Sequence, residues 1–70
     1  MNESGREDYL ERLIQGLEAA IPENRDRLQY YKPEELQHVY TVKFLAKMEE
    51  SLADARLELA GLRRARGAGP

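Results

Sequence analysis

The sequence predicts an all-α protein: an antiparallel helical hairpin that pairs with a second copy into a dimeric four-helix bundle. Three observations predict this fold. Apolar residues recur at helical spacing in both halves of the chain, strand-like alternation is absent, and a proline-containing break separates the halves. The chain has 70 residues and no cysteine, so we expect one small domain without a disulfide. Self-association is then the expected source of additional stability.

The first helix is expected over residues 5–31, because its core positions alternate at intervals of four and three residues. These positions are Leu10, Ile14, Leu17, Ile21, Asn24, Leu28 and Tyr31. Pro22 lies within this series, and a proline inside a helix removes a backbone donor and crowds the preceding turn. Because the repeat keeps its phase across Pro22, we expect one helix kinked at that residue. The alternative is two helices, the second of which begins at Pro22.

A turn is expected at residues 31–33 and a second helix over residues 33–64. Pro33 favours an extended conformation at Lys32 and can occupy the first turn of a helix. Glu34 and Glu35 follow it, where negative charge favours a helix N-terminus. The hairpin domain therefore comprises residues 1–64, and residues 65–70 form a flexible tail.

One face of the second helix is expected to pack on the first helix. Its positions repeat at intervals of three and four residues: Leu45, Met48, Leu52, Ala55, Leu59 and Leu62. We expect Leu36, Tyr40 and Phe44 to extend this face toward the turn with a slight drift. Counting outward from the turn predicts four pairs: Leu28 with Leu36, Asn24 with Tyr40, Leu17 with Met48, and Leu10 with Ala55.

A second apolar series, roughly opposite the first, is the expected dimer interface. It comprises Val39, Val42, Ala46, Ala53, Leu57 and Ala60. Its three alanines are one heptad apart, and alanine allows two helices to approach closely. The alternative is that alanine fills surface positions because it is the best helix former. The valines and the leucine favour an interface, because a helix that is apolar on two sides has two partners.

Asn24 occupies a core position of the first helix. A buried asparagine at such a position fixes the register and the number of partners. Its expected hydrogen-bond partner is the Tyr40 hydroxyl. The alternative is that a kink at Pro22 leaves Asn24 exposed.

Composition and motifs argue against several classes of function. The chain carries 11 basic and 13 acidic residues, so nucleic-acid binding is not expected. No stretch is apolar enough for a membrane span, and the acidic N-terminus is unlike a signal peptide, so we expect a cytoplasmic protein. Glu35 and His38 have the Glu-x-x-His spacing of di-iron bundles, but no inward carboxylate is expected to face them. We therefore expect no metal ion, cofactor, small-molecule substrate or enzymatic activity.

The aromatic residues gather around the expected turn, where residues 28–44 hold four of the five. Tyr30 and Tyr31 are adjacent, so one of them, which we expect to be Tyr30, lies at the surface near His38. Tyrosine and arginine are enriched at protein interfaces. The expected partner-binding residues are therefore Tyr30, Tyr31, His38, Tyr40 and Arg27. The alternative is that the aromatic residues close the end of a small bundle.

The stretch ENRDRLQYYKPEELQ joins one arm to a long returning arm through a short break with proline and acid. This layout is similar to the small hairpin chaperones of type III secretion. It also resembles the small helical anti-activators and inhibitors that phages use against host regulators. The resemblance covers the layout alone and transfers no residue.

The predicted function is non-catalytic binding that inhibits or masks a larger protein, such as a host regulator. One alternative is a secretion chaperone that holds an amphipathic cargo helix on the outer face of its second helix. Another is a DNA-associated regulator that uses the arginines of residues 63–66.

Overall fold

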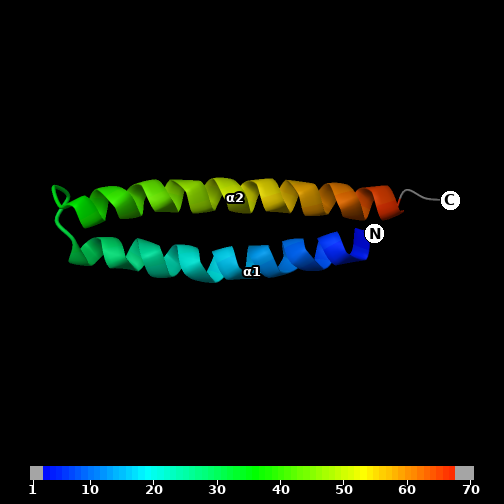
Figure 1. Ribbon diagram of the computed structural model, residues 1–70, viewed down its shortest axis with the longest axis horizontal. Helices are drawn as coiled ribbons and strands as arrows, with labels where there is room; N and C mark the ends of the chain where they lie inside the picture. The colour runs from blue at the N-terminus through cyan, green and yellow to red at the C-terminus, as the bar shows by residue number, and fades with distance from the viewer. Residues whose placement is uncertain (1–2, 68–70) are drawn as a thin grey trace.

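The computed structural model describes residues 3–67, which form two long helices joined by a short turn. Helix α1 spans Glu3–Arg27, the 3-10 turn η1 spans Leu28–Tyr30, and helix α2 spans Leu36–Gly67. The two helices lie side by side and antiparallel in a rod of 56 × 17 × 14 Å (Figure 1). No strand occurs within residues 3–67. The predicted all-α hairpin is therefore confirmed, and its pairing into a dimeric bundle stays a prediction.

Helix α1 continues without interruption through Pro22, so the expected single helix is confirmed and the two-helix alternative is wrong. The kink expected at Pro22 stays a prediction. Pro22 lies on the exposed side of the helix. At this position the helix can tolerate the absence of the backbone N–H that proline lacks. Figure 1 draws α1 as one gently curved helix. Its end differs from the expected Tyr31, because the chain tightens into η1 after Arg27. Tyr31 is extended and its N–H donates to the carbonyl of Leu28 at 3.2 Å.

Helix α2 begins at Leu36 rather than at the expected Pro33, because residues 32–35 form a β-turn. The Glu35 N–H donates to the Lys32 carbonyl at 2.9 Å, which places Pro33 at the second turn position, where its fixed φ is favoured. The Glu35 carboxylate accepts from the Lys32 N–H at 2.6 Å. At its other end α2 reaches Gly67, past the expected Arg64. Residues 65–67 of the expected tail are therefore helical, and residues 68–70 lie outside the described residues.

The core between the arms consists of two apolar clusters. Leu10, Ala55 and Leu59 form the cluster near the open end of the hairpin. Ile21, Leu45 and Met48 form the cluster nearer the turn, with Leu17 and Leu52 packed against it. The expected neighbours Leu10 and Ala55 share the first cluster, and Leu17 and Met48 share the second.

The expected core extension toward the turn is wrong. Leu36, Tyr40 and Phe44 are exposed by 64%, 62% and 56%, so the pairs assigned to Leu36 and Tyr40 do not form in the core. Their spacing of four residues rotates each by about 40° relative to the last. The inward face instead keeps its alternation of three and four residues through the half-buried Thr41 and His38. The Thr41 hydroxyl donates to the Gln37 carbonyl at 2.6 Å, which satisfies it within the helix.

Candidate protein-interaction surface

One side of the core is bordered by three ion pairs, here called the ladder. They join Arg25 to Glu49, Glu18 to Arg56 at 2.5 Å, and Glu11 to Arg63 at 2.7 Å. Successive members are seven residues apart on both helices, in opposite directions along the chain. This is the heptad arrangement in which charged flanking positions select the orientation and register of paired helices.

The order of charges in the ladder opposes slippage of the two arms. Helix α1 presents one arginine and two glutamates, and α2 presents the opposite signs. A slip of one heptad in one direction would bring Arg25 to Arg56. A slip in the other direction would bring Glu18 to Glu49. Each wrong register therefore contains a like-charge pair, which is unfavourable across a helix interface.

The open end of the hairpin is closed by two further ion pairs. Both carboxylate oxygens of the buried Glu7, only 6% exposed, accept from Arg66 Nη1 at 2.8 Å. Arg6 donates to both carboxylate oxygens of Glu58, at 2.6 and 2.8 Å, and its guanidinium lies 5.1 Å from the Tyr9 ring centre. The hydrogen bond from Arg6 lowers the pKa of Glu58, and the same bond raises the pKa of Arg6.

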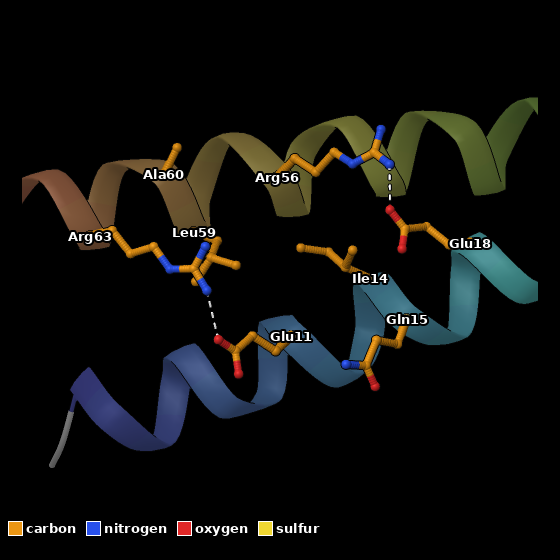
Figure 2. A pocket seen from close by; sticks show the side chains of 8 residues that line it. All are labelled: Glu11, Ile14, Gln15, Glu18, Arg56, Leu59, Ala60 and Arg63. Atoms are coloured by element: carbon orange, nitrogen blue, oxygen red, sulfur yellow. Dashed lines mark hydrogen bonds and ion pairs between the residues drawn. The ribbon is translucent and has the colours of Figure 1, made fainter.

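A groove of about 520 Å³ lies between the arms, between two successive ion pairs of the ladder (Figure 2). It is lined by Glu11, Ile14, Gln15, Glu18, Arg56, Leu59, Ala60 and Arg63. Both of its carboxylates are held by arginines across the arms. Within residues 3–67, no three histidine or acidic side chains are grouped as a metal site would require. The groove therefore brings together charges that hold the two arms to each other.

The structure places the predicted partner-binding residues in different environments. Tyr30 is the most exposed of the large apolar residues that the structure describes, at 78%, whereas Tyr31 is half-buried. Tyr40 and Arg27 are exposed, and His38 is half-buried on the inward face of α2. Four of these five residues thus lie within or close to the turn, and Tyr40 lies one turn into α2.

Asn24 is half-buried and does not pair with Tyr40. Its side-chain amide donates to the Ala20 carbonyl, one turn earlier in α1, at 2.9 Å. A hydrogen bond within the same helix satisfies the amide without a partner from α2. The expected pairing with Tyr40 is therefore absent, and the role of Asn24 in setting the register stays a prediction.

The exposed large apolar side chains are concentrated near the turn. We call this surface the tip patch, and it comprises Tyr30, Leu36, Val39, Tyr40, Val42 and Phe44. Sequence reasoning assigned Leu36 and Phe44 to the core and so missed them as surface residues. The available signal was the alternation of three and four residues, which passes through Thr41 and His38 when polar residues are allowed at core positions.

Every residue of the predicted dimer interface is exposed in the single chain. This holds for Val39, Val42, Ala46, Ala53, Leu57 and Ala60. Ala60 also borders the groove between the arms. The hairpin therefore leaves this face uncovered, and its role as a dimer interface stays a prediction.

Comparison of the chain with protein-family models, curated protein sequences and solved structures finds no match. Among the described residues, neither helix has the length and apolar character that a membrane crossing requires.

Proposed function

We propose that this chain is a non-catalytic, homodimeric binding module of the cytoplasm that inhibits or masks a larger protein through the tip patch. One observation supports this proposal above the others: within the described part of the chain, six of the eight exposed large apolar residues fall within residues 30–44. Single exposed apolar residues are ordinary on protein surfaces, whereas several gathered at one end of a molecule are typical of an interaction site.

The shape of the tip patch favours a helical partner. Leu36, Tyr40 and Phe44 follow one another at intervals of four residues and form a ridge along α2. Such a ridge can pack against the apolar face of an amphipathic helix. Burying one large apolar side chain contributes about 1.5–3 kcal/mol, so a partner that covers several of them gains a useful share of its binding free energy.

The same ridge also supports the secretion-chaperone alternative, in which the bound helix belongs to a cargo protein. The two functions differ in the fate of the complex. An inhibitor remains on an active target and lowers its activity, whereas a chaperone is displaced when its cargo is delivered. The DNA-regulator alternative has less support, because Arg63 and Arg66 are both engaged by carboxylates of α1.

The test is affinity capture from host lysate with three forms of the tagged chain. We expect the wild type to retain one dominant protein at near-equal stoichiometry. The double variant Tyr30→Ser and Phe44→Ser should lose that protein, because it removes apolar area from both parts of the tip patch. The matched control, Tyr9→Ser, removes an exposed tyrosine at the open end of the hairpin and should retain it.

Equal capture by the double variant and the control would show that the tip patch is not the docking surface. Purified target is then assayed with stoichiometric amounts of the chain. Loss of target activity supports an inhibitor, and unchanged activity with protection of an aggregation-prone target supports a chaperone.

A further inference from the structure

The face of α2 that points away from α1 carries a stripe of six exposed residues at alternating intervals of three and four. We call it the outer stripe, and it comprises Tyr40, Lys43, Lys47, Glu50, Asp54 and Leu57. This spacing is the one through which two helices pack in a coiled coil. Figure 1 shows that this side of α2 is not covered by the first arm.

The order of residues in the outer stripe is symmetric about a point between residues 48 and 49. Tyr40 and Leu57 are equally far from this point, as are Lys43 and Asp54, and Lys47 and Glu50. Read along the chain, the stripe is apolar, basic, basic, acidic, acidic, apolar. When such a stripe meets its own copy in the antiparallel direction, each base faces an acid and each apolar residue faces an apolar residue.

We propose that a second copy of this chain binds along the outer stripe, with α2 antiparallel to α2 and a two-fold axis between residues 48 and 49. Tyr40 of each copy then packs on Leu57 of the other. Lys43 meets Asp54, and Lys47 meets Glu50, each pair occurring twice. This inference rests on the homodimer of the proposed function and gives it a geometry, and it is independent of which larger protein the tip patch binds.

The separation of charges supports an intermolecular role for the stripe. Lys43 and Lys47 are one helical turn apart, as are Glu50 and Asp54, and like charges at that interval disfavour an isolated helix. Alternating signs would have avoided this cost. None of these four side chains forms an ion pair with another described residue of the hairpin, whereas Glu49, Arg56 and Glu58 on the neighbouring faces all do. A second copy supplies the missing opposite charges.

Two further features fit the same register. Leu57 is 72% exposed and is the one large exposed apolar residue in the described part of α2 beyond Phe44. The antiparallel register places it at the tip patch of the other copy. A hollow lined by Lys43, Ala46, Lys47 and Glu50 lies beside the two-fold axis, because Ala46 is small. The two facing hollows leave room for the long side chains of the central ion pairs.

The geometry of this dimer differs from a square four-helix bundle. Because the outer stripe lies opposite the core, the four helices form a single layer in which the two α2 helices are central. The series that contains Ala46, Ala53 and Ala60 then lies along one edge of the contact rather than at its centre. Leu36 and Tyr40 lie in or beside this contact. In the dimer a larger partner therefore contacts the tip patch through Tyr30 and Phe44, which stay exposed beside it.

The first test exchanges charges and measures the mass in solution at low salt. The wild type is expected to dimerise. A basic-to-acidic variant (Lys43→Glu, Lys47→Glu) and an acidic-to-basic variant (Glu50→Lys, Asp54→Lys) should each dimerise more weakly by on the order of tenfold or more. An equimolar mixture should form heterodimers. The matched control reverses all four charges and should dimerise as the wild type does.

The second test establishes direction, and it uses the absence of native cysteine. Leu36 and Gly61 are the next equidistant pair on the stripe, and a Cβ atom at Gly61 meets nothing within 4 Å. Leu36→Cys mixed with Gly61→Cys should form a disulfide-linked heterodimer under oxidation. Neither variant alone should link to itself, because its two cysteines lie roughly 37 Å apart in this register.

Self-linking of Leu36→Cys would indicate parallel pairing and overturn the proposal. A monomeric wild type, or half-reversed variants that dimerise like the wild type while circular dichroism shows intact helices, would also overturn it. The Tyr30→Ser and Phe44→Ser variant keeps the outer stripe and should still dimerise. Loss of self-association and loss of partner capture are therefore read from different variants.

Discussion

At the scale of single residues, Glu7 and Arg66 show how a polar pair can continue an apolar core. Glu7 lies three residues before Leu10, and Arg66 lies four residues after Leu62, so each continues the core face of its helix. Glu7 is buried, and the two side chains join the arms where the apolar clusters end. Removing one partner of such a pair strands the other, whereas replacing both by apolar residues can be neutral.

We expect Arg66→Met to lower the free energy of unfolding by about 1–2 kcal/mol, because Glu7 loses the guanidinium that accounts for both of its hydrogen bonds. Adding Glu7→Met should restore stability to the wild-type value or above it, since two apolar residues would then extend the core. Urea denaturation followed by circular dichroism measures both effects. Arg64→Met, which removes an exposed arginine nearby, is the control and should stay within about 0.5 kcal/mol of wild type.

If the double variant is no more stable than Arg66→Met alone, the Glu7–Arg66 pair stabilises the hairpin through the attraction between its two side chains. Burial of those positions in the core would then not be the source of its stabilising effect. That result would contradict the interpretation of Glu7 as a core position.

At the scale of elements, the sequence predicts two antiparallel helices, the core of α2 from Leu45 to Leu62, and a break near Pro33. These features follow from apolar spacing and from proline, which depend on local sequence. The sequence did not predict the beginning of α2 at Leu36, because Pro33 can open a helix or occupy a β-turn. It also did not predict that the core face passes through Thr41 and His38, because an apolar pattern ignores polar core positions.

The ladder was missed for a different reason. Its acidic members are spaced like charges on solvated helix faces, and only the register of the hairpin shows which arginine each one meets. That register depends on where the turn begins and ends, which is where the sequence is ambiguous. Once α1 ends at Arg27 and α2 begins at Leu36, the interval of seven residues on both arms aligns all three pairs.

We expect Glu18→Arg to lower the free energy of unfolding by about 1 kcal/mol at low salt, because two guanidinium groups would then face each other across the arms. The double variant Glu18→Arg and Arg56→Glu restores an opposite-charge pair and should return to within a few tenths of a kcal/mol of wild type. Chemical denaturation at low and high salt gives the complete double-mutant cycle. A single-variant effect that does not diminish at high salt would argue against an electrostatic origin.

At the scale of the whole molecule, the hairpin separates three surfaces. The ladder and the pairs at the open end hold the arms together, the tip patch gathers exposed apolar residues near the turn, and the outer stripe faces away from α1. A rod only two helices wide exposes most of each helix, so a large share of its side chains can serve binding rather than folding. Sequence alone located the aromatic cluster, but the exposure of Leu36, Tyr40 and Phe44 required the structure.

Carboxylates form the ion pairs between the arms, so the stability of the whole hairpin is expected to depend on pH. The hydrogen bond from Arg6 lowers the pKa of Glu58 in the folded chain, so folding favours the ionised form. The resulting stabilisation is present above the pKa of Glu58 in the unfolded chain and is lost as the pH falls through the lowered pKa of the folded chain. We therefore expect the melting temperature to be steady near neutral pH and to fall on acidification below about pH 4–5.

The variant Glu58→Gln removes this titrating group. The melting temperature of the variant should be lower than that of the wild type at neutral pH and should approach it in acid. Thermal unfolding at low protein concentration, which limits any contribution from dimerisation, measures both curves. Two curves that stay parallel from neutral pH to about pH 3 would contradict the linkage between Glu58 and the stability of the hairpin.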